Sequence, residues 1–161
     1  MGLLTTEEYK AIAAGLTLPQ GAFIDGGYRP AASGRTFTTS NPATGEKLTE
    51  IAACGAEDVD FAVHKAREAF EDGCWSRMHP SGRKDVLIRF AKLLTRNARE
   101  LAVMESIDSG KAIYDCETVD IPETIHCIKW HAEAIDKIYD QVAPASDDRS
   151  EEHTSELQSL I

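Results

Sequence analysis

The sequence lacks a hydrophobic run of the roughly 20 residues that a membrane span requires, and it lacks a basic charge balance. It carries 17 lysines and arginines against 27 acidic residues, for a net charge of −10. Because binding to phosphates needs a positive surface, we expect no nucleic-acid partner and no membrane partner. A secretion signal is also missing, since Glu7, Glu8 and Lys10 stand where its apolar stretch would be.

Cysteine is scarce and never has the spacing of a metal or redox motif. No C-x-x-C pair occurs among the four cysteines, which are Cys54, Cys74, Cys116 and Cys127. Without a secretion signal, free and buried thiols are the expected state, and together these features predict a cytoplasmic protein. Residues Met1–Thr6 match the loose myristoylation pattern. A chance match is the preferred interpretation, because that pattern is short and permissive.

The first third of the chain predicts a short helix followed by strands. Glu7–Ala14 is helix-forming, with Thr5 or Thr6 as its N-cap. Alternating and β-branched residues then predict strands in residues 22–28, 36–40 and 48–53, the first of them broken by a turn at Gly26-Gly27. This pattern is typical of a small antiparallel β-meander.

Beyond residue 55 the apolar residues recur at helical spacing. We predict a helix that ends at Gly73, a second that begins with Pro80, a third that ends at Gly110, and a long fourth from Ile121 to Tyr139. Each helix has one apolar face that must pack against another element. Because few strands are present, part of that partner surface is expected to lie outside this chain. Val142-Ala143-Pro144 predict the beginning of another strand.

The last residues differ in composition from the rest. Residues 149–161 are almost all polar up to their last few positions and show no helical stripe. Residues 149–159 resemble the conceptual translation of a sequencing-library adapter, and a natural polar tail is the alternative. We therefore divide the chain into a native segment, 1–148, and a non-native tail, 149–161, which is left out of fold reasoning.

Several stretches, taken in order and spacing, resemble the N-terminal region of the aldehyde dehydrogenase superfamily. The most specific is the turn Asn41-Pro42-Ala43-Thr44-Gly45-Glu46, preceded by Phe23-Ile24-Asp25-Gly26-Gly27-Tyr28. The others are Asp58–Phe70 with Trp75-Ser76, then Arg83–Leu94 with Glu100–Ala102 and Glu105–Lys111, and finally Asp120–Tyr139. The resemblance covers residues 22–143. The last stretch is most similar to enzymes for γ-glutamyl-γ-aminobutyraldehyde, in putrescine catabolism.

The resemblance implies an α/β fold, namely an incomplete N-terminal part of an NAD-binding domain, in which a short β-meander precedes several amphipathic helices. It also implies a parent enzyme that uses NAD or NADP and assembles as a homodimer or homotetramer. In such an enzyme a cysteine thiolate attacks the aldehyde, hydride passes to the cofactor, and a glutamate base activates water to hydrolyse the thioester.

None of these groups can be carried onto this sequence. It contains no Glu-Leu-Gly-Gly-Lys-like segment for the base, no Pro-Trp-Asn-Phe-Pro-like segment for the oxyanion, and no glycine-rich cofactor loop. None of its cysteines has the context of the family's nucleophile. We therefore assign no catalytic or cofactor-binding residue, and we expect this chain alone to bind no cofactor and to oxidise no aldehyde.

One minor site follows from the resemblance. Members of the family often hold a monovalent cation through backbone carbonyls near the Asn-Pro turn and near the aspartate before Ser-Gly-Lys. Here those positions are Ser40 and Asp108, with Thr39 adjacent. Oxygen ligands suit a hard cation, and a turn without an ion is the alternative.

The remaining clusters have simpler interpretations. Cys127 and His131 share a helix face, but two ligands do not make a zinc site, so packing is preferred there and for Cys116. Trp130 and Tyr139 are expected in the core or at an interface. An acidic group is expected to form a solvated helix face: Glu57, Asp58, Asp60, Glu68 and Glu71.

The sequence bears on two other function classes. A non-catalytic helical interaction module with a β-hairpin head remains an alternative, and extending the reading frame past Asp148 would discriminate it from an enzyme segment. A small nicotinamide-binding domain is discounted, because the glycine fingerprint is missing.

Overall fold

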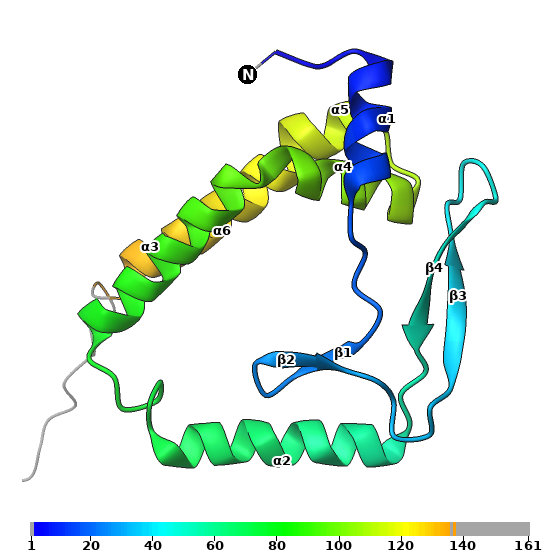
Figure 1. Cartoon of the computed structure of the whole chain (residues 1–161). Helices are drawn as coiled ribbons and strands as arrows, with labels where there is room; N and C mark the ends of the chain where they lie inside the picture. The colour runs from blue at the N-terminus through cyan, green and yellow to red at the C-terminus, as the bar shows by residue number, and fades with distance from the viewer. Residues whose placement is uncertain (1, 136, 138–161) are drawn as a thin grey trace, which may run out of the picture.

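The computed structural model describes residues 2–135 and residue 137. Its elements, in chain order, are α1 (Thr6–Gly15), β1 (Ala22–Ile24), β2 (Gly27–Arg29), β3 (Thr36–Ser40), β4 (Lys47–Ala52), α2 (Ala56–Asp72), α3 (Pro80–Arg96), α4 (Ala98–Ser109), α5 (Ile113–Asp115), the π-helical turn η1 (Cys116–Asp120) and α6 (Ile121–Ala134). Figure 1 shows an open frame, with α2 along one side and α1, α4 and α5 together at the far corner. Tyr139, the strand predicted at Val142–Pro144 and the tail 149–161 lie outside the described residues.

The first helix begins where its capping residues predict. The side-chain oxygen of Thr5 accepts the backbone N–H of Glu8 at 3.3 Å, and the carboxylate of Glu8 accepts the backbone N–H of Thr5 at 2.8 Å. This reciprocal capping box satisfies two backbone donors that the first turn leaves without helical partners. Thr5 is therefore the N-cap, as one of the two predicted candidates.

The predicted strands form, but not as one meander. β1 pairs only with β2, and β3 pairs only with β4, so the described chain holds two separate two-stranded antiparallel sheets. The first turn is also shifted by one residue from the prediction. Asp25 and Gly26 both have positive φ, 56° and 77°, while Gly27 already belongs to β2. An Asp-Gly pair with positive φ at both positions is typical of the tight turn that matches the twist of a hairpin.

The boundaries of α2, α3 and α4 agree with the predictions. Pro80 occupies the first turn of α3, where its missing N–H leaves no helical bond unmade. Gly73 and Gly110 end α2 and α4 with φ of 81° and 78°, a left-handed conformation that costs glycine little.

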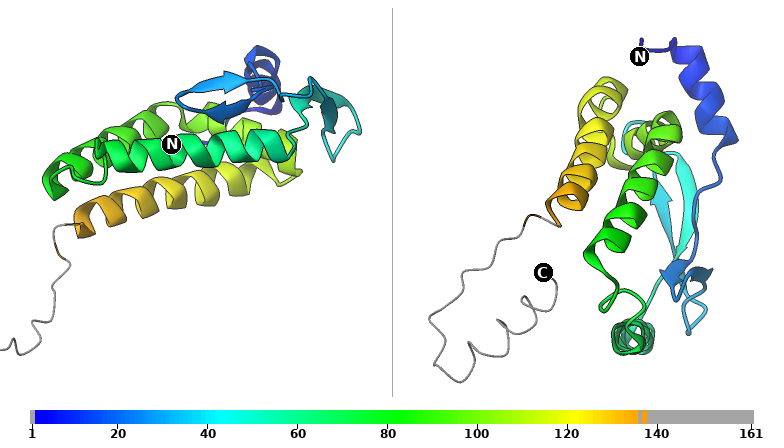
Figure 2. Two further views of the ribbon diagram at one scale, coloured as in Figure 1. Left: turned by 90° about the horizontal axis from the view of Figure 1, so that it is seen from below. Right: turned by 90° about the vertical axis from the view of Figure 1, so that its left-hand side faces the viewer.

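The fourth predicted helix begins at Ile121, as expected, but two short helical elements that were not predicted lead into it. Helical structure begins at Ile113 and passes through η1 before it continues as α6. A π-helical turn accommodates one extra residue and rotates the side chains that follow. The stripe of Ile125, Ile128 and Ala132 is half-buried or buried, and α6 packs along α3. Figure 2 shows these two helices lying side by side.

The core is thin and made mostly of small side chains. The buried apolar residues are Ala31, Ala52, Ala91, Ala102, Val103, Cys116 and Ala132. By contrast, the apolar stripe of α2 is open, with Val59, Val63 and Phe70 exposed by 57%, 62% and 61%. Among the residues that the structure describes, this stripe of α2 is left uncovered, and the expectation that its partner surface lies outside the chain stays a prediction. No helix in the described residues is long and apolar enough to cross a membrane.

Candidate functional site

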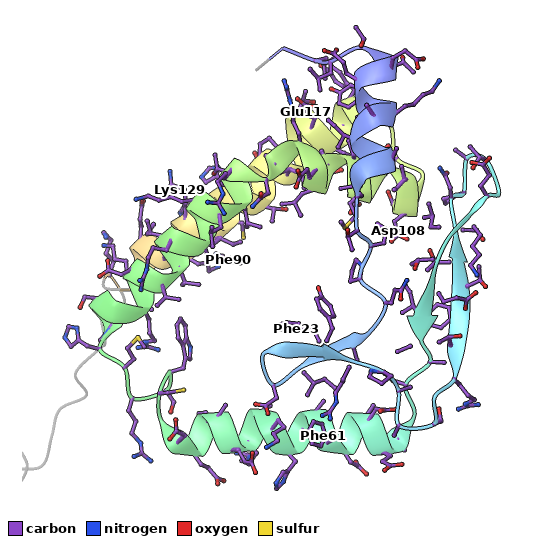
Figure 3. The ribbon with its side chains drawn as sticks, in the orientation of Figure 1. Phe23, Phe61, Phe90, Asp108, Glu117 and Lys129 are labelled. Carbon is purple, nitrogen blue, oxygen red and sulfur yellow. The ribbon has the colours of Figure 1, made fainter. Side chains whose placement is uncertain are left out.

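The two segments predicted to hold a monovalent cation lie next to each other. The Thr39 hydroxyl donates a hydrogen bond to Oδ1 of Asp108 across 3.4 Å, although 69 residues separate them in the chain. The Asn-Pro turn closes on the end of α4 as well, because a Cβ added to Gly110 would lie 3.2 Å from Cβ of Pro42. Asp108 lies at that corner of the frame in Figure 3. The contact is thus made by Thr39, the neighbour of Ser40.

The local backbone explains why this corner presents oxygen atoms. The pairing of β3 with β4 shifts register between Thr39 and Ser40, which turns the strand end out of its regular ladder. In the following turn, the side chain of Asn41 accepts the backbone N–H of Ala43 at 2.9 Å. Ser40 and Asp108 are both exposed. The corner therefore presents exposed side-chain oxygen atoms without a buried charge.

A second polar cluster, not found from the sequence, fixes α1 to the helical layer. The carboxylate of Glu117 accepts the Tyr9 hydroxyl at 2.6 Å and Nε of Arg99 at 3.3 Å. Arg99 also donates to the carbonyl oxygen of Gly2 at 2.8 Å, and the backbone N–H of Leu4 donates to the Tyr9 hydroxyl at 3.1 Å. Glu117 lies in η1 and is labelled in Figure 3. Burial, followed by the hydrogen bond to Glu117, raises the pKa of Tyr9.

Asp58 corrects one prediction about the acidic face of α2. Its residue is 8% exposed rather than solvated, and its two carboxylate oxygens accept the backbone N–H groups of Ala32 and Gly55, each at 2.8 Å. The hydrogen bond from Gly55, then that from Ala32, lowers the pKa of Asp58. This carboxylate therefore caps α2 and ties it to the loop after β2. An aspartate at the third position of a predicted helix was the signal that could have revealed this role.

The four cysteines differ in burial, although all of them were expected to be buried. Cys116 is buried as expected, whereas Cys54, Cys74 and Cys127 are exposed. Burial, followed by the nearby charges of Asp120 and Glu105, raises the pKa of Cys116. A thiol that resists ionisation is a poor nucleophile, so Cys116 is a packing residue.

The exposed aromatic and the thiol–imidazole pair on α6 also depart from expectation. Trp130 is 59% exposed and does not belong to the core of this chain. Cys127 is within 3.6 Å of His131, but the described residues contain no group of three or more His, Cys, Asp or Glu side chains that could hold a metal ion.

Comparison with known proteins matches this segment to one family. A family model described as the aldehyde dehydrogenase family matches residues 28–158. The chain is 61% identical over 142 residues to the aminoacetaldehyde dehydrogenase of Pseudomonas aeruginosa, which covers 88% of this chain and 29% of that protein. It is 42% identical over 134 residues to the NADP/NAD-dependent aldehyde dehydrogenase PuuC of Escherichia coli, covering 83% and 27% of the two chains.

A solved structure has the same fold. The crystal structure of gamma-glutamyl-gamma-aminobutyraldehyde dehydrogenase from Burkholderia cenocepacia matches with a TM-score of 0.86 and 45% identity, over 89% of this chain and 29% of that one. The expected α/β fold class, a mixed segment of small sheets and helices, therefore agrees with a known structure. The chain spans less than a third of the length of these relatives.

Proposed function

This chain belongs to the aldehyde dehydrogenase family, and from that premise we propose that it is the N-terminal part of an NAD(P)-dependent enzyme that oxidises an aldehyde to the carboxylic acid. The observation that carries the proposal is the 61% identity to an aminoacetaldehyde dehydrogenase over 88% of this chain. The name of the Escherichia coli relative, NADP/NAD-dependent, supports NAD or NADP as the cofactor of the whole protein.

The role proposed for this segment is structural. The nucleophilic thiolate, the glutamate base and the nucleotide-binding loop would come from the remainder of the parent protein, because no residue here has their sequence context. Cys116 is unsuited to the task, since burial raises its pKa. The helices α3, α4 and α6, together with the two hairpins, would support the cofactor domain from one side.

The substrate class we propose is an aliphatic aldehyde that carries nitrogen, with γ-glutamyl-γ-aminobutyraldehyde as the specific candidate. Support comes from the names of two similar proteins, one for aminoacetaldehyde and one for gamma-glutamyl-gamma-aminobutyraldehyde. We further propose that the parent enzyme acts in putrescine catabolism. It would work in the cytoplasm as a homo-oligomer.

Reduced-cofactor formation tests the proposal. The 161-residue chain and the reading frame extended past Asp148 would be purified and supplied with NAD or NADP and with γ-glutamyl-γ-aminobutyraldehyde, aminoacetaldehyde or benzaldehyde. We expect the extended protein to be active, with the nitrogen-bearing aldehydes preferred, and the 161-residue chain to be inactive. Heat-labile activity in the short chain would refute its supporting role. An inactive extended protein that still folds would favour the interaction-module alternative.

For the corner formed by Ser40, Thr39 and Asp108, we propose a monovalent-cation site in the parent. Support comes from the Thr39–Asp108 contact, which brings the two segments together. Thermal unfolding of the extended protein in potassium, sodium and choline chloride at equal ionic strength tests it. A higher midpoint in one metal salt, reduced in Thr39→Val, is expected, and equal midpoints in all salts would rule the site out.

A further inference from the structure

The apolar stripe of α2 has the spacing of a coiled-coil seam. Its residues follow one another at alternating steps of three and four, and they are Ala56, Val59, Val63, Ala66 and Phe70. All five are exposed. The stripe runs along the 17 residues of the helix, a length of about 25 Å. This is enough apolar surface, in one straight line, for another helix to lie along it.

The β1–β2 hairpin occupies the opposite side of α2. The guanidinium carbon of Arg29 lies 4.0 Å from the centre of the Phe61 ring, and Nζ of Lys65 lies 3.9 Å from a carboxylate oxygen of Asp25. Because a helix turns by about 100° per residue, Phe61 lies across the helix from the stripe. Figure 2, right, shows α2 end on, with the hairpin to one side of it. A partner helix can therefore reach the stripe without displacing the hairpin.

Two copies of the stripe fit each other when the helices run antiparallel. A two-fold axis between Val63 and Ala66 places Val63 of each copy against Ala66 of the other. The same axis places Phe70 of each copy against Val59 of the other. Each larger side chain then meets a smaller one, as the interlocking side chains of a helix pair require.

The charges beside the stripe favour this antiparallel arrangement. Asp60 and Arg67 are both exposed, and they lie on the same flank because seven residues separate them. Within the part of the chain that the structure describes, neither belongs to an ion pair. In the antiparallel pair, Asp60 of each copy lies beside Arg67 of the other, which gives two ion pairs. A parallel pair would instead place Arg67 beside Ala62 and form neither of them.

We propose that the stripe of α2 in the 161-residue chain docks on the same stripe of a second copy, as a two-fold antiparallel helix pair. Removal of the apolar side chains from water supplies the affinity, and the two ion pairs set the orientation. The pairing does not depend on the enzymatic activity proposed above, because it uses residues of α2 alone.

Sedimentation velocity of the chain at a series of concentrations measures the pairing, with a reducing agent present to keep the exposed thiols from cross-linking. We expect a monomer–dimer equilibrium. Asp60→Arg places like charges together at both ion pairs, as Arg67→Asp does, so each should raise the dimer dissociation constant by roughly tenfold or more. The matched control Glu71→Arg changes the charge equally at an exposed position off the stripe, and should alter the constant less than about twofold.

A mixture of the Asp60→Arg and Arg67→Asp chains tests the antiparallel register. In a mixed pair, the arginine introduced at position 60 faces the aspartate introduced at position 67, and the native Arg67 faces the native Asp60. The mixture should therefore dimerise although each variant alone does so weakly. The double variant Asp60→Arg/Arg67→Asp should also regain the dimer, because it restores both pairs within one sequence. Equal far-UV circular dichroism verifies that the variants keep their helices.

Three results would overturn the proposal. The first is a chain that stays monomeric at every concentration, which would leave the stripe to a different partner. The second is a dissociation constant that Asp60→Arg changes no more than Glu71→Arg does. The third is a mixture that dimerises no better than its two components, together with a double variant that does not recover, which would exclude the antiparallel register.

Discussion

One carboxylate, that of Glu117, links α1 to the helical layer in addition to the packing of α1 on α4, and Glu117→Gln tests its contribution. The side chain of Glu117 is only 10% exposed, and it accepts the Tyr9 hydroxyl at 2.6 Å. A hydrogen bond to a charged group contributes about 1.5–3 kcal/mol. The ion pair with Arg99, whose side chain is 29% exposed, adds no more than about 1 kcal/mol.

Glutamine keeps the shape and one acceptor oxygen but removes the charge. We therefore expect Glu117→Gln to weaken the docking of α1 by about 1.5 kcal/mol, roughly half of the summed contribution. Because about 1.4 kcal/mol corresponds to a factor of ten, backbone amides in α1 should exchange with deuterium about tenfold faster. Peptides from α3 and α6 should change little, since those helices pack on each other.

The control is Glu133→Gln, which removes the same charge from an exposed position on α6. A double-mutant cycle with Tyr9→Phe isolates the pair. If the two substitutions prove additive in their effect on exchange in α1, or if Glu117→Gln leaves that exchange at the level of the control, then Glu117 does not hold the helix and the reasoning fails.

Three further predictions follow from other contacts. Hydrogen bonds from Gly55 and Ala32 lower the pKa of Asp58 in the folded state below its ordinary value of 3.8, so the Asp58 carboxylate stabilises the fold fully above pH 3.8 and loses this contribution as the pH falls through the lower folded value. Asp58→Asn should therefore flatten the acid side of a plot of melting temperature against pH, and an unchanged slope would contradict this. Ala132 is fully buried, so the larger side chain in Ala132→Leu should lower the free energy of unfolding by about 1–3 kcal/mol and with it the melting temperature. Ala66→Leu, at an exposed position, should leave the melting temperature nearly unchanged. Val63 is 62% exposed in an apolar stripe, and exposed apolar patches favour self-association. Val63→Glu should therefore reduce self-association measured by sedimentation velocity, and equal sedimentation of both proteins would show that the stripe does not drive it.

Local signals in the sequence located the helices well. Thr5 caps α1, Pro80 opens α3, and Gly73 and Gly110 end their helices, because each of these positions depends on neighbours only a few residues away. The π-helical turn at Cys116–Asp120 was not predicted, although a local signal for it exists. Pro122 has no N–H for the carbonyl of Thr118, and its ring would clash with that carbonyl in an ordinary α-helix, so an extra residue in this turn relieves the conflict.

The contacts at the candidate sites were harder to predict from the sequence than the helix boundaries. The adjacency of Thr39 and Asp108 followed from family resemblance and not from any pattern, since 69 residues separate them. The Tyr9–Glu117 hydrogen bond spans 108 residues, and no periodicity or motif in this chain connects the two. The charge pattern places Asp58 on a solvated acidic face with Glu57 and Asp60, yet two backbone donors from different segments converge on its carboxylate.

The helices α2 and α6 carry the same kind of apolar stripe but differ in how far that stripe is buried. In α6 the stripe of Ile125, Ile128 and Ala132 packs toward α3, whereas in α2 Val59, Val63 and Phe70 remain open. Periodicity reports which face of a helix must be covered, because it follows from backbone geometry alone. Whether the cover lies within the same segment depends on chain length and topology, and these relatives are more than three times as long as the part matched here. We therefore expect the exposed stripe of α2 to be covered in the longer protein proposed above, and not by the residues that the structure describes here.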